Sequence, residues 1–238
     1  MRHGSPEPCA LALEKKLLLF DIDGTLLATG GAGIRALELA ARETFGDGDL
    51  SVVEIAGRTD SGITRQLLAH HGHAVTPESV ATFLDRYVVH LTRLLPLTDG
   101  RLLPGIVALL DALKGRPDCV LALLTGNLAR GAELKLTHYG VWDYFEFGAY
   151  ADDHCDRNQL GNFARTRAME RHGIAFPPER IYVLGDTPHD IACARAIGAK
   201  AVAIATGQYT HAQLAPHAPD FLFDDLADVP AVIAALTA

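Results

Sequence analysis

Residues 16–26 read KLLLFDIDGTL, a short apolar run that ends in two aspartates and a glycine. The run Lys16–Phe20 predicts a buried strand. Side chains alternate along a strand, so Asp21 and Asp23 should point to one side. Two neighbouring carboxylates repel each other, and a divalent metal with oxygen ligands relieves that repulsion. One carboxylate could then act as a nucleophile and the other as an acid–base group, whereas a solvated Asp-Gly turn is the alternative for an isolated motif.

Two further apolar runs end in polar motifs. Cys119–Leu124 is followed by TGN at 125–127, and Ile181–Leu184 by GDTPHD at 185–190. The first motif offers a hydroxyl, an amide and backbone N–H groups to an anion at a helix start. The second places Asp186 and Asp190 where they could hold a metal. Each motif alone could be a helix cap, but a coincidence at three strand ends favours a functional site.

The rest of the chain alternates strand and helix patterns. Strands are predicted at Ala201–Ala205 and Asp220–Phe223, and helices at Ile106–Lys114, Asn158–His172 and His189–Ile197. Strands alternating with helices predict a doubly wound, parallel α/β sheet of the Rossmann-like kind, covered on both faces. In such sheets, sites form beyond the carboxyl ends of the strands.

One stretch breaks this alternation. From about Ala28 to Asp99 the pattern is helical, most clearly over Thr76–Leu95, where Thr76 can cap the helix and Pro96 stops it. Glycines at both ends of the stretch predict hinges. We therefore expect an α/β catalytic core at residues 1–27 and 101–238, with an inserted helical cap at 28–100.

Composition excludes several classes of protein. The chain has 238 residues, 21 of them basic and 29 acidic, for a net charge of −8, which disfavours nucleic-acid backbones as partners. No apolar run approaches the ~20 residues of a membrane span, and the patch Cys9–Leu13 is too short for a secretory signal. The cysteines form no C-x-x-C pair and are expected to be buried thiols of a reducing cytosol: Cys9, Cys119, Cys155 and Cys193. We expect a cytoplasmic monomer or homodimer without nucleic-acid or membrane partners.

From Lys16 to the C-terminal region, these motifs resemble the haloacid dehalogenase superfamily, specifically its phosphoglycolate-phosphatase-like members with a helical cap. DIDGTL at 21–26 matches the first motif of the family, TGN at 125–127 the second, and GDTPHD at 185–190 the fourth. The helical insert directly after the first motif matches the family's cap.

The resemblance implies two-step phosphoryl transfer. Asp21 would attack phosphorus, and Asp23 would protonate the leaving oxygen and then activate water. Mg²⁺ would bind the Asp21 and Asp186 carboxylates and the Asp23 carbonyl, with Asp190 nearby or bound through water. Thr125 and neighbouring N–H groups would hold the transferring oxygens, and the substrate would be bound by Gly24, Thr25, Gly126 and Asn127. The presence of Asp23 favours hydrolysis of a phosphate ester or anhydride over dehalogenation.

One departure concerns the third motif, which in the family is usually a lysine. No lysine lies between Lys135 and Lys200, but Arg157 stands just before the predicted helix that starts at Asn158. An arginine keeps its charge and can bind phosphate through two parallel hydrogen bonds, so Arg157 is the candidate. The alternative is a surface arginine.

The loop Gly57-Arg58-Thr59-Asp60 precedes a predicted cap helix. The resemblance implies that this loop reads the leaving group, with Arg58 pairing with a carboxylate or a second phosphate. The alternative is a polar turn in which Thr59 caps the helix. His70, His71 and His73 are expected at a solvated helix end rather than on a metal, and His189 at a helix start.

Together these expectations predict Mg²⁺-dependent hydrolysis of a small phosphorylated metabolite, with phosphoglycolate the leading substrate by resemblance. A sugar phosphomutase and a pyrophosphatase would use the same core. A phosphate-sensing or partner-binding protein without turnover is the non-catalytic alternative.

Overall fold

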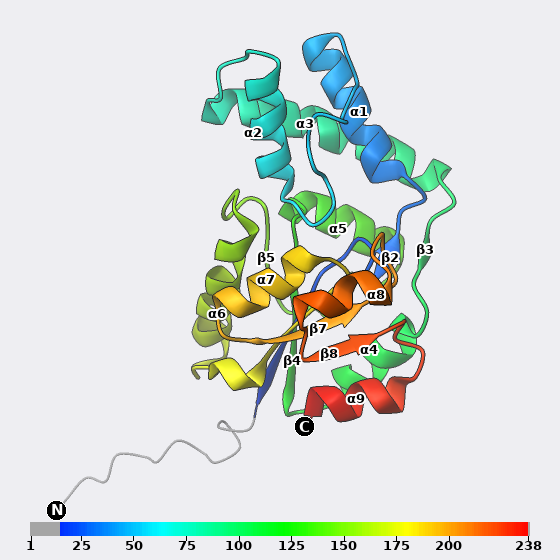
Figure 1. Cartoon of the computed structure of the whole chain (residues 1–238), viewed down its shortest axis with the longest axis vertical. Helices are drawn as coiled ribbons and strands as arrows, with labels where there is room; N and C mark the ends of the chain where they lie inside the picture. Colours follow the sequence, from blue (N-terminus) through cyan, green and yellow to red (C-terminus); the bar gives the residue numbers. More distant parts are fainter. Residues whose placement is uncertain (1–14, 238) are drawn as a thin grey trace, which may run out of the picture.

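The computed structural model describes residues 15–237 and has a six-stranded parallel sheet at its centre (Figure 1). The strand order is β5-β4-β1-β6-β7-β8. The bounds are β1 Lys16–Phe20, β4 Cys119–Leu124, β5 Gly148–Ala149, β6 Ile181–Gly185, β7 Lys200–Ile204 and β8 Phe221–Phe223. Every pair of neighbouring strands is parallel, which confirms the predicted doubly wound sheet.

Helices cover both faces of this sheet. One apolar layer packs against α4 (Ile106–Lys114), α5 (Ala129–His138) and α9 (Val229–Thr237). The opposite layer packs against α6 (Arg157–His172), α7 (Pro188–Ala196) and α8 (His211–Leu214). Short 3₁₀ turns lie in the connections: η2 Leu95–Leu97, η3 Trp142–Tyr144, η4 Pro178–Arg180 and η5 Ala215–His217.

The register of the central strands places the three polar motifs at one edge. Phe20 of β1 lies opposite Leu123 of β4 and Leu184 of β6. Because parallel strands run in the same direction, the residues that follow each strand emerge together. Asp21, Thr125 and Asp186 are therefore neighbours, although they are far apart in sequence.

A helical segment, residues 28–100, lies over that edge (Figure 1). It contains α1 (Ala32–Phe45), α2 (Asp60–His70) and α3 (Pro77–Leu94), which bury an apolar cluster of their own around Phe83 and Leu91. Thr76 caps α3 as predicted, since its hydroxyl accepts a hydrogen bond from the Ser79 N–H at 3.2 Å.

The two chain segments that connect the sheet to the helical segment form a small antiparallel ribbon, in which β2 (Leu27–Ala28) pairs with β3 (Arg101–Leu102). Gly30, beside this ribbon, has φ +62°, and a Cβ there would approach the Asp99 carbonyl oxygen to 2.7 Å. Glycine is thus needed at the crossing. The division into a core at 1–27 and 101–238 and a cap at 28–100 stays a prediction.

Two expectations from the sequence were wrong or incomplete. The Cys155 thiol is exposed, although Cys119 and Cys193 are buried as expected. The prediction placed a helix start at the second motif but gave no bounds for α5, whose charged residues lower its mean hydropathy. Cys9 and the patch Cys9–Leu13 lie outside the described residues. Within 15–237, no helix has the length and apolarity to cross a membrane.

Candidate active site

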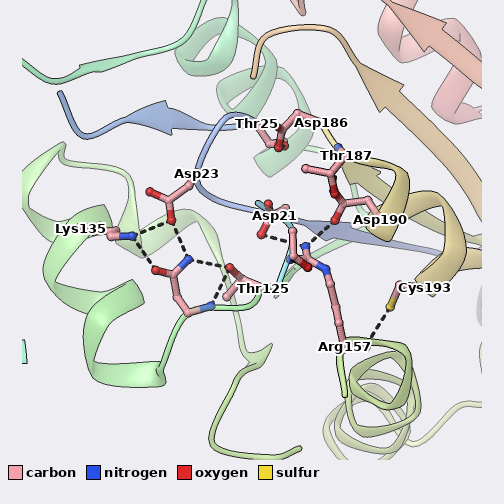
Figure 2. Close-up of polar contacts among 12 residues, drawn as sticks. Asp21, Asp23, Thr25, Thr125, Lys135, Arg157, Asp186, Thr187, Asp190 and Cys193 are labelled. Carbon is pink, nitrogen blue, oxygen red and sulfur yellow. Dashed lines mark hydrogen bonds and ion pairs between the residues drawn. The ribbon is translucent and has the colours of Figure 1, made fainter. Parts of the chain in front are cut away.

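Three aspartates meet at the carboxyl edge of the sheet (Figure 2). Asp21 follows β1, Asp186 follows β6, and Asp190 lies in the first turn of α7. One carboxylate oxygen of each lies within 4.8 Å of the others, and all three residues are buried. The predicted coincidence of strand-end carboxylates is therefore present in the fold.

These carboxylates are costly to ionise. Burial raises the pKa of Asp21 to about 6, and the Asp190 and Asp23 carboxylates act in the same direction, against Arg157. Burial and then the Asp190 and Asp21 carboxylates hold the pKa of Asp186 well above its usual range. Buried like charges of this kind call for a cation. An all-oxygen, carboxylate donor set fits a hard divalent ion such as Mg²⁺.

Gly24 and Thr25 shape this cluster from the turn after β1. Gly24 has φ +82°, and a Cβ there would overlap the Asp186 carboxylate. Thr25 was predicted to bind substrate, but its buried hydroxyl donates to Asp186 Oδ1 at 3.2 Å. It is not among the residues that line the cavity described below. Thr25 therefore holds Asp186 in place.

Asp190 combines two of the roles considered from the sequence. Its Oδ2 accepts hydrogen bonds from the Thr187 N–H at 3.0 Å and the Thr187 hydroxyl at 2.7 Å, which closes a capping box at the start of α7. Its Oδ1 accepts a short hydrogen bond from Arg157. Asp190 thus stabilises the helix start and also belongs to the charged cluster.

Arg157 lies inside the site rather than on the surface. It is the first residue of α6, with Asp156 as the N-cap. Its Nη2 lies 3.1 Å from Asp21 Oδ1, and its Nη1 donates to the Gly57 carbonyl at 3.2 Å. Burial opposes its positive charge, but Asp190 and then Asp21 outweigh burial and raise the pKa of the guanidinium. The permanent cation therefore neutralises part of the aspartate cluster.

Asp23 faces a different set of partners from Asp21. Its Oδ2 accepts hydrogen bonds from Lys135 Nζ at 2.6 Å and from Asn127 Nδ2 at 2.8 Å. Asn127 Nδ2 also donates to the Thr125 hydroxyl oxygen at 2.9 Å, which links the second motif to the first (Figure 2). The Asp23 side chain is outside the metal cluster, so only its backbone carbonyl remains for the metal role that the resemblance implies.

Lys135 is a site residue that the sequence analysis missed. It lies on α5, is 3% exposed, and donates to both Asp23 and the Asn127 side-chain oxygen, each at 2.6 Å. A detectable signal existed, because Leu128, Ala132, Lys135 and Leu136 fall at helical spacing behind the TGN motif. A lysine in such a buried stripe points to a partner carboxylate.

The loop Gly57–Ser61 is tied to the sheet edge. The Thr59 hydroxyl donates to the Cys155 carbonyl at 2.6 Å, and the Asp60 N–H donates to the Gly126 carbonyl at 2.7 Å. Ser61 Oγ donates to the Ala151 carbonyl at 2.8 Å. Thr59 also caps α2, as the alternative interpretation predicted, by accepting from the Gly62 N–H at 3.0 Å.

The loop Gly57–Ser61 can approach the second motif this closely because residue 126 is a glycine, since a Cβ there would overlap the Arg58 carbonyl oxygen. Two residues of the second motif, Gly126 and Asn127, line the cavity beneath the loop, whereas Thr125 is fully buried behind them.

The Arg58 side chain is paired within its own segment. Its Nη2 lies 2.5 Å from Glu54 Oε2, and Glu54 Oε1 lies 3.1 Å from His189 Nε2. Glu54 thus connects the helical segment to the start of α7. His71, which follows α2, stacks on Phe45 with the ring centroids 4.3 Å apart.

A cavity of about 380 Å³ lies between the sheet edge and the helical segment. Asp21, Asp23 and Asp186 line its floor, and Arg157 and Lys135 line it as well. Its outer wall comes from α1, α2 and α3 through Ile34, Leu37, Asp60, Ile63 and Tyr87. The site therefore has a charged inner end and a largely apolar outer end.

Comparison with known proteins gives a consistent picture. A HAD-hydrolase-like family model matches residues 160–229. The probable phosphatase IndB of Dickeya dadantii (strain 3937) is 29% identical over 230 residues, which is 90% of this chain and 92% of that protein. The phosphoglycolate phosphatase of Mannheimia succiniciproducens is 25% identical and covers 92% and 98% of the two chains. A predicted phosphoglycolate phosphatase from Haemophilus somnus 129PT has the same fold, with a TM-score of 0.65, 19% identity and coverage of 92% and 98%.

Proposed function

We propose that this haloacid dehalogenase-like phosphatase of the phosphoglycolate-phosphatase-like type hydrolyses a small phosphorylated metabolite in a Mg²⁺-dependent reaction through an aspartyl phosphate. The observation that carries the proposal is the position of Asp21. This carboxylate lies beside Arg157 and between two further buried aspartates, at the floor of the cavity.

Asp21 is the proposed nucleophile. An attacking carboxylate and a phosphate oxygen repel each other by about 4 kcal/mol per pair of unit charges at 4 Å and an effective dielectric of 20. Mg²⁺ held by Asp21, Asp186 and Asp190 would supply Lewis-acid stabilisation of that charge. Arg157 contributes a second, permanent positive charge 3.1 Å from the Asp21 carboxylate.

Asp23 is the proposed acid–base group. It would protonate the leaving oxygen in the first step and take a proton from water in the second. Lys135 and Asn127 hold its carboxylate in one orientation through the hydrogen bonds described above. The carboxylate is 42% exposed, so solvent reaches it. Lys135 is a positioning residue in this scheme.

Two further features of the site support phosphoryl transfer. Gly126 and Asn127 of the second motif line the cavity, where they could bind the transferring oxygens. The helical segment lies over the site and seats its loop on the core, so we assign it the role of a cap that excludes water.

The test is phosphate release from a panel of phosphate esters, with Mg²⁺ and with EDTA, by the wild type and Asp21→Asn. Mg²⁺-dependent release that Asp21→Asn lowers at least 10³-fold supports the proposal. Asp85→Asn is the matched control, because this exposed residue lies outside the cavity lining and pairs with Arg130 on the surface. Interconversion of sugar phosphates without net release would instead identify a phosphomutase.

Metal binding has a readout that does not depend on turnover. Added Mg²⁺ should raise the Tm of the wild type by relieving repulsion among the buried carboxylates, and Asp186→Asn should reduce that rise. A Tm unchanged by Mg²⁺ at millimolar concentration would contradict the metal assignment.

A further inference from the structure

We propose that the leaving group of the substrate is an uncharged, hydroxylated alcohol of the sugar or polyol kind, and that Asp60 excludes leaving groups that carry a carboxylate. The inference rests on the proposed phosphatase function and narrows its substrate class. It departs from the glycolate leaving group that the family resemblance suggested.

The positive charges that line the cavity are already matched by protein carboxylates. Lys135 Nζ lies 2.6 Å from Asp23, and Arg157 contacts Asp21. The remaining cation in this part of the described chain is Arg58, whose guanidinium makes two hydrogen bonds to Glu54. A carboxylate on the leaving group would therefore find its counter-charges occupied.

Asp60 adds a negative charge to the side of the cavity that the helical segment forms. It lines the cavity from the first turn of α2, and its own side chain is buried. Oδ2 accepts a hydrogen bond from the Leu128 N–H at 2.9 Å, whereas within residues 15–237 no protein group donates to Oδ1. An anionic leaving group here would be repelled at short range, where protein surroundings screen charge weakly.

The Asp60 carboxylate cannot easily move away from the substrate. Its own N–H donates to the Gly126 carbonyl at 2.7 Å, and the preceding Thr59 is bonded to the Cys155 carbonyl. The backbone on both sides of the carboxylate is thus attached to the core. A carboxylate held beside the bound leaving group disfavours a second carboxylate there, which is discrimination by an unfavourable contact.

Hydroxyl groups suit the same surroundings. A carboxylate oxygen accepts hydrogen bonds, and the phenol of Tyr87, which lines the cavity nearby, can both donate and accept. Ile34, Leu37 and Ile63 form an apolar wall against which a carbon skeleton can pack. The cavity of about 380 Å³ equals roughly a dozen water volumes of ~30 Å³ each, which is ample for a leaving group of several carbons.

The experiment compares matched esters that differ in charge, using the full chain with Mg²⁺. The pairs are glucose 6-phosphate with 6-phosphogluconate, and glycerol 3-phosphate with 3-phosphoglycerate, with phosphoglycolate added. We expect kcat/KM to be at least tenfold higher for the uncharged member of the better-cleaved pair. Equal values, or a preference for the carboxylate ester, would overturn the inference and leave the phosphatase function standing. Absence of phosphate release from every ester would contradict the proposed function itself.

Two variants test the role of Asp60. Asp60→Asn keeps an oxygen for the Leu128 N–H but removes the charge, so it should shift the ratio of kcat/KM towards the carboxylate ester about tenfold. Glu54→Gln weakens the pairing of Arg58 and should shift the ratio in the same direction. The control Asp85→Asn, at an exposed residue outside the cavity lining, should leave the ratio unchanged. An unchanged ratio in folded Asp60→Asn would remove Asp60 from the explanation and overturn the proposal.

Discussion

Asp60→Asn should make the protein more stable at neutral pH, although it removes a charged residue from the site. Burial raises the pKa of Asp60 from 3.8 to about 6, against the opposing effects of Lys135 and the Leu128 N–H. The folded state therefore holds a proton that the unfolded chain releases near pH 4. Each pH unit is equivalent to about 1.4 kcal/mol, so ionised Asp60 lowers the free energy of unfolding by about 3 kcal/mol above pH 6.

The pH dependence of the free energy of unfolding shows whether ionised Asp60 stabilises or destabilises the folded state. Because the folded pKa is raised, the wild type loses stability from Asp60 as pH increases from about 4 to 6 and regains none of it at higher pH. Asn cannot ionise and keeps an oxygen for the Leu128 N–H. The difference in free energy of unfolding should therefore be near zero at pH 4 and about 3 kcal/mol at pH 7.5 in favour of Asp60→Asn.

Urea denaturation in EDTA at several pH values between 4 and 7.5 measures this difference. Other buried aspartates titrate in both proteins, so their contributions cancel in the comparison. Asp85→Asn is the control, because it removes an exposed carboxylate whose surface pair with Arg130 is worth no more than about 1 kcal/mol. If Asp60→Asn were less stable than the wild type at pH 7.5, or if the difference did not vary with pH, the account of Asp60 as a buried, unfavourable charge would be wrong.

Two other substitutions test how the site is assembled. Gly126→Ala should lower kcat/KM at least tenfold, because the new Cβ would displace the loop that holds Arg58. The control Gly131→Ala on α5, whose Cβ would lie 3.8 Å from Leu91, should leave kcat/KM unchanged. Steady-state kinetics measures both variants, with circular dichroism to confirm that they fold. Lys135→Met should lower kcat about 10–100-fold with little change in KM, because a charged hydrogen bond worth roughly 1.5–3 kcal/mol no longer orients Asp23. An unchanged kcat would exclude Lys135 as a positioning residue.

Local sequence patterns were sufficient for much of the fold. The runs Lys16–Phe20 and Cys119–Leu124 coincide with β1 and β4, and Ile106–Lys114 coincides with α4. These elements are bounded by strong signals, namely continuous apolar residues followed by a turn motif, or a helical stripe followed by glycine. The bounds of helix α5 were not predicted, because its buried face includes a glycine and a lysine, which a hydropathy pattern reads as breaks.

The candidate site, like the fold, could be predicted only in part from local sequence patterns. Asp21, Asp186 and Arg157 could be named from the sequence, because each follows or precedes an element whose type was clear, and parallel strands bring their ends to one edge. The pairing of Lys135 with Asp23, the seating of Asp60 on Gly126, and the burial of Thr25 behind Asp186 could not. They depend on contacts across 60 to 160 residues of chain, which local patterns do not encode. The sequence by itself determined which groups stand at the strand ends and are proposed for the chemistry, because strand and turn patterns are local. Only the tertiary structure decided which charges are paired and which line the cavity, because burial and pairing follow from packing.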